Sequence, residues 1–257
     1  MRLFIGTSGY RYPDWEKGVF YPKGVGDRLA YLMERVNAIE INSSFYNIPK
    51  PAVVERWAQS VPEGARLVLK APRSVSHRRR LKLESPEGVA QGRDLLLYFI
   101  EGCLQVPLAI RGPVLLQLPE NIPIHLDRLN AVLALFGEHG LRVAVEIRHE
   151  SWLVHEAYAL LRRHGAALVA TQWKFFTVPV IETTDFIYVR FHGPDPLHPY
   201  WGGYAEDDLQ RFLDDILASG VAEAYVFFNN DYHAHAPRNA MTMLEMAGVT
   251  KNLQAGQ

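Results

Sequence analysis

The most constraining feature of this sequence is a series of eight short apolar runs, most of them separated by stretches with the periodicity of amphipathic helices. Several runs are almost continuously apolar, which is typical of parallel strands covered on both faces. Eight βα units in 257 residues match the TIM-type (β/α)8 barrel. The strands that we expect are Leu3–Thr7, Ala38–Ile41, Leu67–Lys70, Val114–Leu118, Val143–Ile147, Ala167–Ala170, Phe186–Phe191 and Ala224–Phe228.

The segments between these runs predict seven helices. Asp27 and the pair Ser85–Pro86 are suitable helix starts, and Gly220 is a suitable stop. The sixth unit is irregular, because residues 171–184, TQWKFFTVPVIETT, show no clear helical pattern. The helices that we expect are Asp27–Val36, Pro51–Ser60, Pro86–Gln105, Leu126–Gly137, Trp152–His164, Ala205–Ala218 and Pro237–Met246.

A doubly wound open sheet is the alternative architecture. A phosphate-binding GxGxxG after the first strand would favour it, but this segment reads GTSGYRYPDW. The chain has no low-complexity tract, internal repeat or obvious linker, and its length suits one large α/β domain. We therefore predict a single barrel domain over residues 1–257, with one irregular unit after the sixth strand.

Composition limits the class of partner. The net charge is −1, so a nucleic-acid or membrane partner would have to be recognised by a local patch. Cys103 is the single cysteine, which excludes an internal disulfide and argues against a zinc–thiolate site. The most apolar region, residues 95–118, is too interrupted by polar residues to span a bilayer, and the N-terminus lacks a signal-peptide pattern. We expect a cytoplasmic protein without a membrane segment.

Polar side chains follow the carboxyl ends of most expected strands. The last strand is an example: YVFF runs directly into Asn229, Asn230 and Asp231. In barrels of this type the chemistry gathers at the carboxyl ends of the strands, so we expect these residues to share one mouth. The candidate residues are Glu40, Asn42, Tyr46, Lys70, Arg73, His77, Gln117, Glu146, Arg148, His149, Trp152, Arg190, His192, Asn230 and Asp231.

Each of these groups also has a structural interpretation. Glu40, Lys70, Glu146 and Arg190 could form a buried ion network, because buried charges need partners. Charge clusters with perturbed pKa values also mark functional sites, so both interpretations stay open. The run Arg78–Arg80 could be a solvated surface, or it could bind anions beside Lys70.

The sequence resembles the YecE-like family, domain of unknown function 72. The resemblance rests on GTSGYRYPDW, VNAIEINSSFYNIP, KAPRSVSH, LLQLP, VAVEIRHESW, YVRFHG, FFNND and APRNA, which occur in order over nearly the whole chain. It implies a TIM-type barrel and leaves the activity open. The positions that match the family pattern are Glu40, Asn42, Tyr46, Lys70, His77, Gln117, Glu146, Arg148, His149, Trp152, Arg190, His192, Asn230, Asp231 and Asn239.

The first functional hypothesis is a protein that binds or acts on a phosphorylated ligand, either a sugar phosphate or a nucleic-acid phosphodiester. Glu40 and Glu146 would supply acid/base groups or metal ligands, and His192 and Asp231 would complete a metal set. Lys70, which we also expect to be a catalytic residue, would hold phosphate oxygens together with the arginines of the mouth.

Two alternatives remain. In the first, the chain is a metal-free anion-binding or nucleic-acid-binding protein that contacts phosphates through Lys70, Arg73 and Arg78–Arg80. In the second it is a glycoside hydrolase whose paired carboxylates are Glu40 and Glu146. The sequence leaves the cofactor, the presence of a metal and the oligomeric state open.

Overall fold

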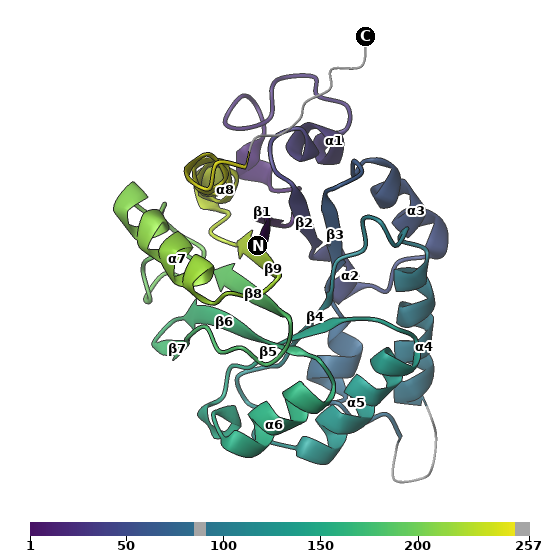
Figure 1. The fold of residues 1–257 in the computed structure, drawn as a ribbon. Helices are drawn as coiled ribbons and strands as arrows, with labels where there is room; N and C mark the ends of the chain where they lie inside the picture. The colour runs from purple at the N-terminus through teal and green to yellow at the C-terminus, as the bar shows by residue number, and fades with distance from the viewer. Residues whose placement is uncertain (85–90, 250–257) are drawn as a thin grey trace.

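The computed structural model describes residues 1–84 and 91–249, and it contains a nearly closed barrel of parallel strands (Figure 1). The barrel strands are β1 (Arg2–Ser8), β2 (Ala38–Ile41), β3 (Arg66–Leu69), β4 (Val114–Gln117), β5 (Val143–Glu146), β6 (Ala167–Trp173), β8 (Phe186–Phe191) and β9 (Glu223–Phe228). Their order is β3-β2-β1-β9-β8-β6-β5-β4, and isolated bridges from Leu67 to Arg111 and from Lys70 to Leu115 join the two edges. The predicted TIM-type α/β barrel is confirmed.

The helices lie around the outside of the barrel (Figure 1). They are α1 (Arg28–Met33), α2 (Ser43–Tyr46), α3 (Pro51–Gln59), α4 (Gln91–Leu104), α5 (Leu126–Glu138), α6 (His155–Arg163), α7 (Glu206–Ala218) and α8 (His235–Met246). Short 3-10 turns cover Pro13–Trp15, Glu150–Trp152 and Tyr232–Ala234, and a π-helical turn covers Ser74–Arg78. Within the described ranges, no helix has both the length and the apolar character needed to cross a membrane.

The predicted helix boundaries hold with small corrections. Asp27 does begin α1, because its carboxylate accepts hydrogen bonds from the backbone N–H groups of Leu29 and Ala30 at 2.9 and 3.1 Å. Trp152 was expected to begin α6 but belongs to the preceding 3-10 turn, and α6 starts at His155. The expected start at Ser85–Pro86 lies outside the described residues.

The irregular sixth unit is a β-hairpin. After β6 the chain turns at Lys174, where φ is 53°, and returns as the antiparallel strand β7 (Phe176–Val178), which the sequence analysis missed. Residues 179–185 then lead to β8 without a helix. A cavity of about 480 Å³ lies outside β6 and β8 at this point, bordered by Val178 and by Phe212 of α7.

Side chains alternate between two apolar clusters along the strands. One cluster fills the space between the strands and the helices, and the other fills the inside of the barrel. Because alternate residues of a strand face the same side, the residue two positions after an inward apolar residue also faces inward. The inner cluster comprises Phe4, Ala38, Val68, Leu115, Ala144, Ala167, Val169, Phe186, Tyr188, Tyr225 and Phe227.

The layer above this inner cluster is polar. Glu40, Lys70, Gln117, Glu146 and Arg190 each stand two residues after an inner apolar residue of the same strand, and all five are buried. The carboxyl end of the barrel is therefore closed by a layer of ionisable and amide groups, which we call the upper layer. This placement follows directly from the two-residue period of the strands.

Gly6 of β1 provides a test of how tightly the barrel is built. A Cβ atom at this position would stand 1.8 Å from the backbone oxygen of Ala38 on β2, so Gly6→Ala must push two paired strands apart. We expect a loss of at least about 2–3 kcal/mol in the free energy of unfolding, measured by urea denaturation. Gly26→Ala is the control, because nothing lies within 4 Å of its Cβ position. Equal stability of the two variants would contradict this packing.

Candidate functional site

Arg190 is the centre of the upper layer. Its side chain is fully buried and donates to Glu40 through Nε and Nη2 at 3.1 and 2.8 Å. Nη1 donates to Glu146 at 2.5 Å, and Nη2 also donates to the hydroxyl of Ser8 at 2.8 Å. The structure thus brings together the two carboxylates that the sequence analysis selected, and one guanidinium bridges them.

Further donors contact both carboxylates. Glu40 also accepts from the phenol of Tyr188 at 2.6 Å and from the hydroxyl of Ser8. Glu146 also accepts from Nε of Arg148 at 2.7 Å. Burial alone would raise the pKa of Glu146, but the Arg190 and Arg148 cations lower it well below its ordinary value. Glu146 is therefore an anion at every physiological pH.

His192 is a neutral hydrogen-bond acceptor in this network. The hydroxyl of Thr171 donates to the backbone oxygen of Arg190 at 3.1 Å, so it accepts from Nδ1 of His192, also at 3.1 Å. Nε2 of His192 lies 3.2 Å from Arg190 Nη1 and 3.3 Å from Arg148 Nη2. Guanidinium nitrogens only donate, so Nε2 carries no proton. Burial and the Arg190 cation lower the pKa of His192 well below its usual value.

The donor set does not suit a metal ion. Within the part of the chain that the structure describes, no group of three or more His, Cys, Asp and Glu residues could hold one. The lone pairs of Glu40, Glu146 and His192 are directed at guanidinium groups, which would repel a cation. Asp231 makes no hydrogen bond or ion pair with these three residues, and burial together with the Asp14 carboxylate raises its pKa to about 6.

Lys70, at the end of β3, is the upper-layer cation without a carboxylate partner. Lys70 is 8% exposed, and its Nζ lies 4.4 Å from the centre of the Phe45 ring. No residue of 1–84 or 91–249 accepts a hydrogen bond from Nζ. Burial and the Arg190 cation lower the pKa of Lys70 to about 7, although Glu40 and Glu146 act in the opposite direction.

Arg73 follows Lys70 by three residues and lies over the ring of Tyr46, the residue next to Phe45. Its guanidinium carbon lies 5.4 Å from the centre of the Tyr46 ring, and the Phe45 and Tyr46 ring centres are 5.2 Å apart. Nε of Arg73 is enclosed and has no hydrogen-bond partner among the described residues. His77 packs edge-on against Phe45 at 4.9 Å, and burial with the Lys70 cation lowers its pKa to about 4.

The opposite side of the mouth is formed by Arg148 and Trp173. The Arg148 guanidinium carbon lies 3.7 Å from the Trp173 ring centre, a stacking distance, and Trp173 Nε1 donates to Glu120 at 2.7 Å. Gln117 belongs to the same layer and is 6% exposed. Its amide makes no hydrogen bond with any described residue. Lys70, Arg73 and Gln117 therefore all keep polar atoms without partners among residues 1–84 and 91–249.

Other candidate residues hold loops in place. Trp152 is buried and donates to the backbone oxygen of Ile122 at 2.9 Å, whereas Nδ1 of His149 accepts from the backbone N–H of Ser151 at 3.2 Å. Asn42 donates to the backbone oxygen of Ser8 at 3.0 Å. Asn230 donates to the backbone oxygen of Gly202 at 2.8 Å, but its Oδ1 is enclosed and has no partner in the described part of the chain.

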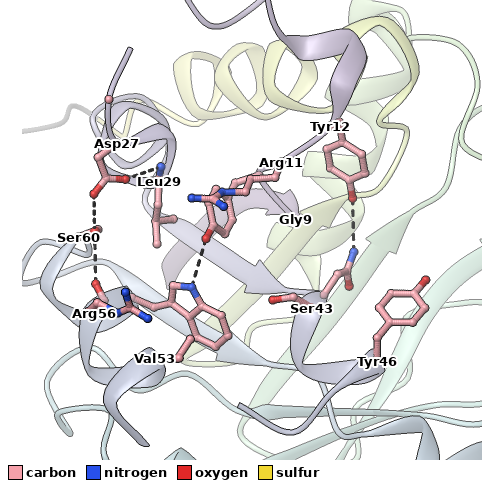
Figure 2. Close-up of a pocket in the computed structure, with 14 residues that line it drawn as sticks. Gly9, Arg11, Tyr12, Asp27, Leu29, Ser43, Tyr46, Val53, Arg56 and Ser60 are labelled. Atoms are coloured by element: carbon pink, nitrogen blue, oxygen red, sulfur yellow. Dashed lines mark hydrogen bonds between the residues drawn. The ribbon is translucent and has the colours of Figure 1, made fainter. Parts of the chain in front are cut away.

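A side cavity of about 760 Å³ has none of the five upper-layer residues in its lining (Figure 2). Asn42 and Tyr46 are the candidate residues that reach it, and Arg11 and Arg56 add two cations to its lining. On its wall the Trp57 indole donates to the Tyr10 phenol at 3.2 Å. Tyr46 stands between this cavity and Arg73, so it links the two regions.

Four further residues of the site were not among those predicted from the sequence: Ser8, Thr171, Trp173 and Tyr188. The two-residue alternation of strands could have identified some of them. Tyr188 lies two residues before Arg190, and Trp173 lies two residues after Thr171, so each pair faces the same side of its strand. Neutral side chains at inward positions carry no charge that would draw attention in the sequence. Their importance comes from hydrogen bonds to charged partners on other strands.

The fold and the site define a TIM-type barrel whose carboxyl end carries an arginine-bridged pair of carboxylates and an unpaired lysine. A family model described as "Protein of unknown function DUF72" matches residues 4–257, and the chain belongs to that family. A segment of 76 residues, 30% of this chain, is 31% identical to the UPF0759 protein YecE of Escherichia coli K12 and covers 26% of that protein.

Solved structures show the same architecture. A DUF72 family protein of Thermotoga maritima is 28% identical, with a TM-score of 0.73 over 96% of this chain and 100% of that chain. A DUF72 family protein of Enterococcus faecalis is 19% identical, with a TM-score of 0.81 over 99% of both chains. D-psicose 3-epimerase of Clostridium cellulolyticum, 10% identical with a TM-score of 0.55 over 97% of this chain and 99% of that chain, shares the fold.

The Arg190 bridge predicts how the upper layer contributes to stability. Arg190→Met would leave Glu40 and Glu146 buried without their shared cation, so we expect a loss of about 3–5 kcal/mol in the free energy of unfolding. Lys70→Met is the control in the same layer. It removes a buried amine without a carboxylate partner, so stability should stay the same or rise. Urea denaturation of both variants at pH 7 measures the difference.

The dependence of protein stability on pH tests the ion pairs of Glu146. The folded-state pKa of Glu146 is depressed, so its stabilisation is complete above the unfolded-state pKa of about 4.3 and is lost as pH falls below that value. Glu146→Gln should lower stability at pH 7 and flatten its dependence on pH below about 4. A Glu146→Gln protein as stable as the wild type at pH 7 would contradict the network.

Proposed function

We propose that the chain binds a small phosphorylated ligand at the carboxyl-end mouth of the barrel. The observation that carries the proposal is the pair of cations at the end of β3 and in its following turn: neither Lys70 nor Arg73 forms an ion pair or donates a side-chain hydrogen bond to any described residue. A largely buried cation without an anionic partner is costly, and a phosphate group would satisfy it.

The charges of the mouth favour an anion. The two carboxylates Glu40 and Glu146 face three side chains that can be cationic, namely Arg190, Arg148 and Lys70. When Lys70 is protonated, the positive charges therefore exceed the negative charges. Arg73 adds a further cation beside Lys70. In a region of restricted water access, such a surplus attracts anions more strongly than it would in bulk water. The phosphate would lie between Arg73, Lys70 and Arg148, and the rest of the ligand would extend past Tyr46 toward the side cavity.

The other hypotheses receive less support. A glycoside hydrolase needs one carboxylic acid with a raised pKa, whereas the Glu146 pKa is lowered and both carboxylates are held by Arg190. For nucleic-acid binding, the basic run is partly engaged: Arg79 donates to Gln91 and Arg80 to the backbone oxygen of Asn121, each at 2.6 Å. A small ligand therefore suits the site better than a polynucleotide. The cytoplasmic location stays a prediction.

Calorimetric titration with 2-phosphoglycolate tests this function. Arg73→Met should weaken binding about tenfold or more, because hydrogen bonds to charged groups contribute about 1.5–3 kcal/mol. Arg163→Met is the matched control, since Arg163 is exposed in the last turn of α6, far from the carboxyl ends of the strands. Raising the salt concentration should weaken binding to the wild type. No heat of binding in the wild type, or equal affinities in both variants, would refute the proposed site.

A further inference from the structure

Lys70 differs from the other lysines in chemical surroundings. Among the lysines within 1–84 and 91–249, Lys70 is buried, whereas Lys17, Lys23, Lys50, Lys82 and Lys174 are exposed. An exposed lysine is almost entirely protonated at neutral pH and has no free electron pair. A lysine enclosed beside apolar and cationic groups keeps a larger neutral fraction, and this is one way in which proteins make an amine nucleophilic.

Burial and nearby cations favour the neutral form of the amine. The face of the Phe45 ring attracts the ammonium form but also shields the amine from water, and Arg190 and Arg148 are the cations near it. The Glu40 and Glu146 carboxylates, which would stabilise an ammonium ion, are hydrogen-bonded to the two arginines. His77 faces Lys70 from the following turn and is neutral at pH 7.

The amine is also reachable. Within the described chain, the fully enclosed polar side-chain atoms without a partner are Arg73 Nε and Asn230 Oδ1. Lys70 Nζ has no hydrogen-bond partner either, yet it is not among those enclosed atoms, so it keeps an opening to solvent. Its position at the carboxyl end of β3 directs this opening to the mouth, where catalytic groups of such barrels lie.

We propose that Lys70 Nζ is a nucleophile that forms an imine with the carbonyl carbon of a phosphorylated aldehyde or ketone. This inference rests on the phosphate site proposed above and specifies the ligand class for it. Arg73 and Arg148 hold the phosphate, and this places the carbonyl carbon beside the amine. Gln117, whose amide has no partner in the described part of the chain, is placed to contact the carbonyl or a hydroxyl of the same ligand.

The step needs no oxidant and no further reactant. The electron pair of Nζ attacks the carbonyl carbon, a C–N bond forms, and the C=O π bond breaks. A proton passes from nitrogen to oxygen to give a carbinolamine. The C–O bond then breaks, water leaves, and a C=N bond forms. One amine and one carbonyl compound thus give one imine and one water molecule.

Borohydride trapping of the full chain with glycolaldehyde phosphate tests the inference. Borohydride reduces the imine to a stable secondary amine, and peptide mass spectrometry then locates the added mass. We expect modification at Lys70 at least tenfold faster than at Lys50, and suppression by 2-phosphoglycolate. Unphosphorylated glycolaldehyde should react more slowly at Lys70. The initial rate at Lys70 should rise with pH and level off well below about 10.4, the pKa of an ordinary lysine.

Two variants complete the test. Lys70→Arg has no nucleophilic amine at this position, so it should lose the trapped adduct. Lys50→Arg should keep both the adduct and the affinity of the wild type for 2-phosphoglycolate. Modification spread evenly over Lys50, Lys174 and Lys70 and insensitive to 2-phosphoglycolate would overturn the imine proposal. If 2-phosphoglycolate binds the wild type but no adduct forms, the imine proposal fails and the phosphate site stands; if 2-phosphoglycolate does not bind, the site itself fails.

Discussion

The buried guanidinium of Arg190 is the interaction on which the upper layer of this barrel depends. A carboxylate buried alone would be protonated or would destabilise the fold, and two of them close together would repel each other. Arg190 donates to both Glu40 and Glu146, which joins β2, β5 and β8 across the inside of the barrel. Tyr188, Ser8 and Arg148 donate further hydrogen bonds to the two carboxylates. The two glutamates are therefore held in place as partners of Arg190, and the donors without partners among the described residues lie beside them.

In this arrangement some charged groups bind each other and stabilise the barrel, whereas others have no partner among the described residues. Glu40, Glu146 and His192 look like acid/base or metal-binding groups in the sequence, but their lone pairs are directed at arginines. Lys70 looks like one more member of the ion network, but its amine has neither a carboxylate nor a hydrogen-bond acceptor in the described part of the chain. A negatively charged ligand can bind Lys70 and Arg73, the cations that this network does not engage.

Much of the fold could be predicted from the sequence, because the two-residue period of buried strands and the apolar runs are local signals. The barrel, its eight parallel strands and the irregular unit after β6 follow from them. The hairpin strand β7 was missed because Phe176–Val178 is too short to show a period. The residues at the mouth were also predictable, since strand ends converge in this fold. The sequence also allowed a buried ion network of Glu40, Lys70, Glu146 and Arg190, which the structure shows for Arg190 and the two glutamates, but it did not say which of the four would pair. That Arg190 lies between two glutamates from distant strands, whereas Lys70 lies over Phe45, depends on side-chain geometry that no local pattern encodes.

The most direct test of this account is the titration of Lys70 itself, followed by NMR on protein with isotope-labelled lysine, with Lys70→Arg used to assign the signal. We expect a midpoint near pH 7 in the free protein, because burial and Arg190 disfavour the ammonium form. Sulfate, whose charge is constant in this range, should raise the midpoint by binding the protonated amine. A midpoint near the ordinary lysine value of about 10.4, unchanged by sulfate, would contradict the account.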